Sequence, residues 1–196
     1  MHDELLADIL AGRFMPGDAI PSERALSESL GVNRHAVREA IKRLQQTGLV
    51  AVSQGGATRV TDWRRTAGLD LLTSLSATAG EDLVVAIAEM RAAVGADVAR
   101  LCALRSPDAP GIAPDDSEDG YVAFWEAITD GAGNVAYRLA LNTLVAAQRN
   151  GAIDPELYAA EREDLVAQRA LADAIARGDG VTAHDLADAL LRRAVA

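Results

Sequence analysis

The segment PSERALSESLGVNRHAVREAIKRLQQTGLVAVSQGGATRV at positions 21–60 constrains the fold most, because three local signals follow one another in it. Ser22 is a preferred N-cap residue and Gly31 a preferred helix stop, so we expect a helix between them. Asn33 can cap a second helix that runs on to Gly48. Two helices joined by so short a turn predict a helix-turn-helix.

Two short runs of apolar and β-branched residues follow, at positions 49–53 and 57–61, around a Gln-Gly-Gly tip. This pattern is typical of a two-stranded hairpin. Glycines at the tip would let the backbone approach a sugar-phosphate wall, and Gln54, Thr58 and Arg59 would supply donors beside it. A hairpin that only closes the domain fits the same residues. With the two helices, the hairpin predicts a winged helix-turn-helix.

The second helix should have one apolar and one basic face. At helical spacing the inward residues are Val37, Ile41 and Leu44, and the outward residues are Arg34, Arg38 and Lys42. Arginine can donate two hydrogen bonds from its guanidinium group to guanine O6 and N7. Asn33 can reach a phosphate or a base edge. Such charges can also merely solvate a helix, but the surrounding pattern favours DNA contact. For His35, contact and plain exposure are equally compatible with the sequence.

Five fragments in register resemble the DNA-binding domain of the GntR family of bacterial transcription regulators: RFMPG at 13–17, PSER at 21–24, GVNR at 31–34, VREA at 37–40 and GL at 48–49. The resemblance implies that Arg24, Arg34 and Arg38 read the major groove. The full set of residues expected at the DNA is Arg24, Asn33, Arg34, His35, Arg38, Lys42, Gln54, Gly55, Thr58 and Arg59.

Charge divides the chain unevenly. The total is 19 basic against 29 acidic residues, and the part up to position 60 is neutral, so the acidity lies beyond it. An acidic second half, combined with a local basic stripe of Arg34, Arg38 and Lys42, favours sequence-specific DNA binding over nonspecific DNA binding. The sequence has no apolar run long enough for a membrane helix. Its first residues lack the succession of basic, apolar and small residues that is typical of a signal peptide. We therefore expect a cytoplasmic protein without membrane contact.

Alanine- and leucine-rich helical periodicity dominates after Asp62. We expect a bundle of helices at 66–77, 81–105, 121–130, 135–150, 155–177 and 182–194, with an acidic, proline-containing loop at 106–120. The single cysteine, Cys102, lies in an apolar run and is expected to be a core thiol.

This second half resembles the ligand-binding bundle of the FadR subfamily of GntR regulators. The fragments that carry the resemblance are GLDLL at 68–72, EMR at 89–91, FWEAITDGAGN at 124–134 and AIARGD at 174–179. Members respond to small carboxylates or to acyl-CoA, which implies such an effector here. The candidate effector-binding residues are Arg91, Tyr121, Trp125, Asn134 and Gln168.

Many members of the subfamily hold a metal with one Asp and three His. The resemblance places Tyr121, Trp125, Gln168 and Leu190 at those four positions, and none of them suits a transition metal. We therefore predict no metal and no other cofactor. Because the acyl-CoA-responsive members also lack the metal, the loss tilts the expected effector toward an apolar, thioester-like molecule.

The bundle is also expected to be one helix shorter than usual for the subfamily, because a loop replaces the helix before position 121. That change could widen a pocket, expose an apolar groove for a partner, or accompany loss of sensing. Phe124 and Trp125 could line the pocket or belong to the core. Arg91 could clamp an effector carboxylate or pair with an acid such as Asp173.

These expectations combine into a mainly α chain with a winged helix-turn-helix at residues 1–62 and a helical bundle at 63–196. We expect a homodimeric regulator, a repressor on a palindromic operator of double-stranded DNA, modulated by an organic acid or acyl-CoA. The alternative is a DNA-binding regulator whose bundle serves only dimerisation or contact with a partner protein. The sequence offers no nucleophile with an adjacent base, so we expect no enzyme.

Overall fold

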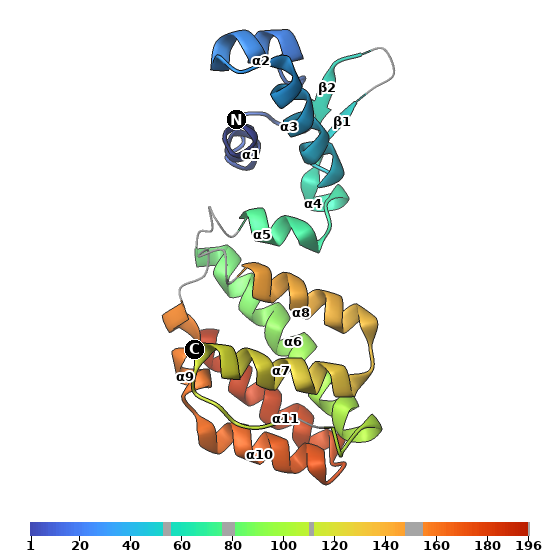
Figure 1. Cartoon of the computed structure of the whole chain (residues 1–196), viewed down its shortest axis with the longest axis vertical. Coiled ribbons are helices and arrows are strands. Elements are labelled where there is room, and N and C mark those ends of the chain that lie inside the picture. The colour runs from blue at the N-terminus through green and yellow to red at the C-terminus, as the bar shows by residue number, and fades with distance from the viewer. Residues whose placement is uncertain (53–55, 76–80, 110–111, 148–154, 196) are drawn as a thin grey trace. The chain divides into compact units, whose positions relative to one another are not determined.

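The computed structural model describes residues 1–52, 56–75, 81–109, 112–147 and 155–195 (Figure 1). They belong to two compact units, Met1–Leu71 and Leu72–Ala196. The expected boundary after Asp62 precedes this division, so the residues just after the wing group with the first unit.

The first unit is a winged helix-turn-helix. Its elements are α1 (His2–Leu10), α2 (Glu23–Leu30), α3 (Arg34–Gln46), β1 (Val50–Val52) and β2 (Thr58–Val60). The two strands pair antiparallel, with Val50 opposite Val60. The segment before α2 runs beside β2, where Ile20 N–H donates to the Thr58 carbonyl at 2.9 Å. The hairpin expected from the sequence is confirmed.

The helix limits expected around the turn are also confirmed. Ser22 Oγ accepts from Ala25 N–H at 3.2 Å, and Asn33 Oδ1 accepts from Ala36 N–H at 2.8 Å. Gly31 ends α2 with φ of 65°, and Gly48 follows α3 with φ of 75°. Both values lie in the left-handed region that glycine adopts without a steric penalty.

The sequence interpretation missed α1. Its buried side chains are Leu5, Leu6 and Ile9, and the helix packs against α3. Those three residues share one helical face, so the apolar periodicity that predicts an amphipathic helix was present in the sequence.

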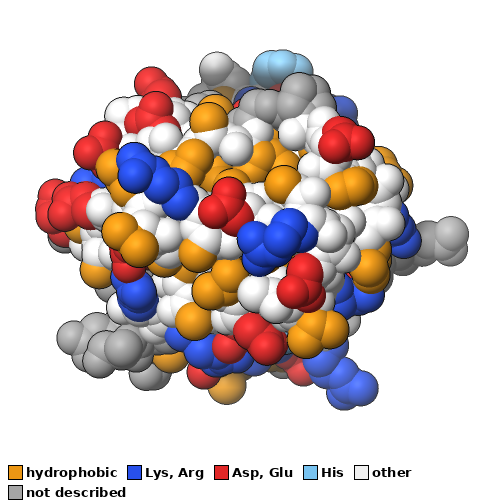
Figure 2. Space-filling view, turned by 90° about the horizontal axis from the view of Figure 1, so that it is seen from below, with side chains coloured by type: hydrophobic (Ala, Val, Ile, Leu, Met, Phe, Trp, Pro, Cys, Tyr) orange, Lys and Arg blue, Asp and Glu red, His pale blue; other side chains and the backbone are white. Residues whose placement is uncertain are grey.

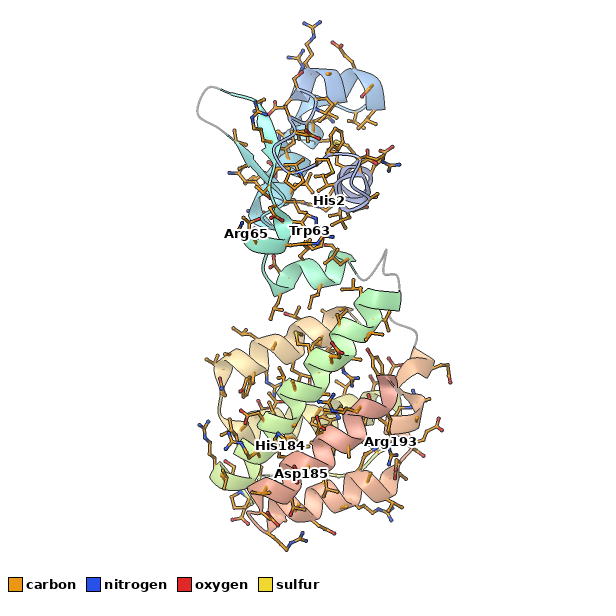
Figure 3. The ribbon with its side chains drawn as sticks, turned by 180° about the vertical axis from the view of Figure 1, so that it is seen from behind. His2, Trp63, Arg65, His184, Asp185 and Arg193 are labelled. Atoms are coloured by element: carbon orange, nitrogen blue, oxygen red, sulfur yellow. The ribbon has the colours of Figure 1, made fainter. Side chains whose placement is uncertain are left out.

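The single helix expected at 66–77 is wrong. The structure has instead α4 (Trp63–Thr66), the 3-10 helix η1 (Leu69–Leu71) and α5 (Leu72–Leu75), and positions 76–77 lie outside the described residues. Ala67 is extended, with φ of −80° and ψ of 153°, and this interrupts the helix. The Arg64 guanidinium carbon lies 4.3 Å from the centroid of the Trp63 ring, and Figure 3 labels Trp63 in the first unit.

The second unit is a helical bundle. Its main elements are α6 (Glu81–Arg105), α7 (Glu118–Ala132), α8 (Val135–Ala147), η4 (Pro155–Tyr158), α9 (Ala159–Arg162), α10 (Leu165–Ala176), α11 (Gly180–Leu191) and η5 (Arg192–Val195). Helix α6 has the limits expected from the sequence, and it contacts α7, α8, α10 and α11. Buried small residues such as Ala92, Ala96 and Ala99 line it, which allows close helix packing. Cys102 is buried in this core, as expected.

The helix expected at 155–177 is broken in the structure. Residues 155–162 form η4 and α9, and a new helix, α10, begins at Leu165. Asp164 acts as its N-cap, because its Oδ1 accepts from Ala167 N–H at 2.8 Å. Between α6 and α7, the described residues 106–109 and 112–117 form no helix, in agreement with the expected loop, but α7 begins at Glu118, three residues before its expected start.

Exposed apolar side chains are interspersed with charged ones on the face drawn in Figure 2. The most exposed large apolar residues of the bundle include Val166 on α10 and Val181 on α11. Single exposed apolar residues are common on soluble proteins and need no partner.

Candidate DNA interface and ligand cavity

The exposed face of α3 carries the basic stripe. Val37 and Leu44 are fully buried. Arg34, Arg38 and Lys42 are exposed on the opposite side. The amphipathic spacing in the sequence therefore gives the arrangement that was expected from it. A helix with this face can place its guanidinium groups against base edges in a major groove.

Two of the candidate groove-reading arginines already have carboxylate partners. Arg38 donates to Glu23 through Nε at 3.3 Å and Nη2 at 3.1 Å, and Arg24 Nε donates to Glu28 at 3.0 Å. The bond to Glu23 raises the pKa of Arg38 above its usual value. These pairs are exposed, so DNA phosphates and bases can compete for the same donors.

The remaining candidate DNA contacts lie in or near the wing and the turn. Thr58 is half-buried, and Arg59 is exposed with Nη1 donating to the Gly17 carbonyl at 2.7 Å. Asn33 uses its amide oxygen as a helix cap, which leaves its amide N–H groups free for a phosphate. His35 is exposed on α3. Gln54 and Gly55 lie outside the described residues.

The bundle contains a cavity between α6, α7 and α8. Its volume is about 60 Å³, and among its lining residues are Arg91, Val98, Tyr121, Trp125 and Tyr158. Sites for drug-sized ligands usually measure about 300–1,000 Å³. A long acyl chain would therefore need side chains to move, whereas a short head group would not.

Arg91, which marks the polar end of this cavity, forms a buried ion pair with Glu161, a residue behind the lining. Arg91 Nη2 donates to Glu161 Oε1 at 2.6 Å, and the Glu161 side chain is 0% exposed. The Arg91 guanidinium carbon also lies 3.9 Å from the centroid of the Tyr158 ring, a cation–π contact. The partner of Arg91 is therefore Glu161 and not Asp173, which is exposed on α10.

Polar atoms around this pair lack hydrogen-bond partners. The donors are Arg91 Nη1, Tyr121 Oη, Trp125 Nε1 and Tyr158 Oη, and the acceptor is Glu161 Oε2. Buried polar atoms without partners cost about 1–3 kcal/mol each. Burial raises the pKa of the Tyr121 hydroxyl, and the Glu161 charge adds to that effect. An acceptor group of a ligand at Arg91 could pair with these donors.

The structure separates the candidate effector residues into two groups. Arg91, Tyr121 and Trp125 line the cavity, whereas Asn134 and Gln168 are not among its lining residues. Asn134 Oδ1 accepts from Ala136 N–H at 3.0 Å at the start of α8. Gln168 is buried beside the loop between α6 and α7. Its Oε1 accepts from Asp115 N–H of that loop at 3.0 Å, and its Nε2 donates to the Arg162 carbonyl at 2.6 Å.

The positions that hold a metal in related bundles do not fit one here. Tyr121 and Trp125 contribute a phenol and an indole packed edge to face at 6.4 Å, and Leu190 is hydrocarbon. Both the oxygen and the nitrogen of the Gln168 amide form hydrogen bonds with the backbone. Within the described residues no three His, Cys, Asp or Glu side chains cluster as metal ligands would. In Figure 3, His184 lies beside Asp185 on α11 and His2 lies in the other unit.

Sequence reasoning missed Glu161 and Tyr158. Glu161 lies in the segment AERED, where three acidic or basic neighbours indicate a solvated helix face. Its burial follows from the short α9 and from the break at Asp164, which the periodicity did not predict. Phe124 belongs to the core, while Trp125 belongs to the core and also lines the cavity.

The fold and the exposed basic helix define a transcription regulator of the helix-turn-helix class. The family model described as bacterial regulatory proteins, gntR family, matches residues 1–60. The HTH-type transcriptional regulator Mce2R of Mycobacterium tuberculosis is 40% identical over 212 aligned positions, which cover 99% of this chain and 88% of that protein. The chain therefore belongs to the GntR family.

A second relative agrees with this assignment, and one solved structure shows the same fold. The fatty acid metabolism regulator protein of Edwardsiella ictaluri is 30% identical over 158 positions, covering 73% of this chain and 65% of that protein. The solved structure of Lar, which controls the expression of the Listeria monocytogenes agr system, has a TM-score of 0.50 at 17% identity and covers 99% of this chain and 94% of its own. The two sequence relatives, Mce2R and the fatty acid metabolism regulator, are named as regulators and not as enzymes. None of the helices in the described residues has the length and apolar character needed to cross a membrane.

Proposed function

We propose that this GntR-family regulator is a cytoplasmic, homodimeric repressor that binds a palindromic operator and releases it when a small acyl or carboxylate effector fills the bundle cavity. The observation that carries the effector half of this proposal is the set of four buried donors without partners around Arg91. A carbonyl or carboxylate group would supply the missing acceptors. Two further features support the same class of ligand. The four positions compared with metal ligands carry no side chain that suits a transition metal, and the chain is similar to fatty acid metabolism regulators.

The apolar walls suit the tail of such a molecule. Val94, Val98, Val122, Leu141 and Val145 line the cavity beyond the polar end. Burying one methylene group against such walls contributes about 0.8 kcal/mol. The polar head would be held at Arg91 while the tail lies along α6 and α8. A wholly polar metabolite would leave these walls without a partner.

The proposal is tested by operator release. The operator would be obtained by binding-site selection with the full chain, and affinity for it measured with and without a panel of organic acids and acyl-CoAs. We expect at least one panel member to raise the melting temperature and to weaken operator binding. A ligand at one hundred times its Kd adds about 2.7 kcal/mol of stability. Its effect on DNA affinity cannot exceed its preference for the DNA-free arrangement.

Arg100 provides a matched control for Arg91. It lies on the same helix, but it pairs with Asp97 and is half-exposed. R100M should respond to the effector like the parent, whereas R91M should not respond. If no panel member stabilises the parent while operator binding stays strong, the bundle serves dimerisation or a partner protein. The exposed Val135 and Leu139, one turn apart on α8, are then the first surface to test.

A further inference from the structure

The charges at the polar end of the cavity are already balanced without a ligand. Arg91 is paired with Glu161 at 2.6 Å, and both side chains are mostly or fully buried. The neighbouring Arg162 pairs with Glu163 at 3.3 Å. An effector that enters this site therefore meets open hydrogen-bond donors but no uncompensated positive charge.

We infer that Glu161 sets the charge of the effector head, so that the site takes an uncharged carbonyl group, such as an amide, ester or thioester, in preference to the carboxylate of the same chain. This inference rests on the proposed function, since it concerns the ligand of the same cavity. It makes Glu161 a specificity-determining residue that acts through Arg91.

The physical reason is the cost of a second buried carboxylate. A carboxylate head at Arg91 would lie near the buried, charged Glu161, and like charges disfavour each other's ionisation. One of the two groups would have to take up a proton. An uncharged carbonyl oxygen could accept from Arg91 Nη1 and the tyrosine hydroxyls with no proton change.

The groups that act on Glu161 come from three elements: Arg91 from α6, Tyr121 from α7 and Tyr158 from η4. Burial raises the pKa of the Glu161 carboxyl, while the charge of Arg91 and its hydrogen bond lower that pKa by a smaller amount. Protonation of Glu161 is therefore easier than that of an exposed glutamate. Binding of a carboxylate should strengthen as pH falls, because the uptake of one proton changes affinity by up to about tenfold per pH unit.

The first experiment uses the unaltered protein. Kd is measured by calorimetry for matched pairs of a fatty acid and its primary amide, with about four to ten carbons to suit a small cavity, between about pH 6 and pH 8. We expect the amide of at least one pair to bind about tenfold or more tightly than its acid at the upper pH, with a pH-independent Kd. The affinity of the protein for the acid should fall as the pH rises. Equal, pH-independent affinities for acid and amide would overturn the inference.

The second experiment inverts the preference. E161Q leaves the Arg91 charge uncompensated, so it should bind the acid more tightly than the amide and lose the pH dependence. E163Q is the matched control, because Glu163 lies two positions away with its side chain 65% exposed, and it should behave like the parent. If E161Q does not fold, the pH series on the unaltered protein still decides.

The two proposals fail in distinguishable ways. If acids bind the parent and release operator, but E161Q keeps the parent's acid-to-amide ratio, the role of Glu161 is wrong and the effector function stands. If no acid, amide or acyl-CoA binds the parent, both are overturned, and the DNA-binding assignment is unaffected.

Discussion

Exposed arginines on α3 decide sequence recognition if the stripe reads a major groove. Replacing Arg34 or Arg38 by Ala should weaken specific binding by about 1–3 kcal/mol each and relax base preference. Lys42→Ala should weaken binding to all DNA sequences equally. It should also lower, by about one, the slope of the logarithm of the binding constant against the logarithm of the salt concentration, as loss of a phosphate contact does. Binding-site selection and salt titration measure these effects. Retention of the parent's base preference by both arginine variants would refute the assignment.

Tyrosine hydroxyls at the cavity differ in whether they have a partner. Those of Tyr121 and Tyr158 have none, whereas Tyr137 Oη donates to Asp97 at 2.7 Å. In the ligand-free protein, Y121F and Y158F should therefore keep or raise the melting temperature, while Y137F should lose about 1 kcal/mol. Calorimetric unfolding compares the three. Equal destabilisation by all three would mean that the two cavity hydroxyls are satisfied and that no ligand is needed there.

The role of an individual residue was predictable where a single local rule determines it. Ser22 and Asn33 are caps because short polar side chains satisfy the first N–H groups of a helix. Glu161 and Tyr158 were not predictable, because their burial depends on contacts with Arg91, which lies far away in the sequence on another helix. Arg91 itself was found, but with Asp173 as its candidate partner.

Among the elements, the turn between α3 and the wing depends most on a glycine. Gly48 has φ of 75°, and a Cβ there would lie 2.8 Å from the Thr66 carbonyl oxygen. Its own carbonyl accepts from Thr61 Oγ1 at 2.5 Å and Thr66 Oγ1 at 2.8 Å. G48A should therefore cost more than the about 1–2 kcal/mol of left-handed strain alone.

Gly31 supplies the control for Gly48. It has a similar φ of 65°, but a Cβ there would meet nothing within 4 Å. G31A should show the strain alone, so thermal unfolding of the two variants separates strain from collision. Equal losses of stability would mean that α4 moves aside at no cost.

Long periodic elements were predicted well and interrupted ones were not. Helix α6 has its expected limits because its apolar residues recur at helical spacing up to Arg105, with no proline and only Gly95 inside the helix. The helix expected at 155–177 failed because Asp164 caps a new helix in the middle of an uninterrupted apolar pattern. A residue with good capping chemistry can end one helix and begin another, which periodicity alone does not register.

For the whole molecule, we expect a homodimer on a two-fold symmetric site. Dimers of helix-turn-helix proteins place their recognition helices in half-sites separated by about one helical turn of DNA or a multiple of it. Light scattering should give twice the chain mass of 20.6 kDa, and selected sites should be palindromic. A monomer at DNA-binding concentrations, together with an asymmetric selected site, would contradict this.

The whole molecule should also be indifferent to metal removal. Tyr121, Trp125 and Leu190 offer a transition metal no suitable ligand atom, and Gln168 is held by backbone bonds. A chelator should therefore leave the melting temperature unchanged, and elemental analysis should find no stoichiometric zinc, manganese or nickel. One equivalent of metal that disappears on replacing Gln168 or His184 would overturn this prediction.

The two tryptophans of the chain are divided between its two units. Trp63 lies in α4 of the DNA-binding unit under Arg64, and Trp125 lines the bundle cavity. Each unit thus contains its own intrinsic fluorophore. With W63F, all indole emission comes from Trp125 at the cavity wall and should report ligand occupancy. With W125F, it comes from Trp63 in α4 of the DNA-binding unit and should report DNA binding. Two single substitutions, without any label, therefore allow the two events to be followed separately, each in the titration of its own variant.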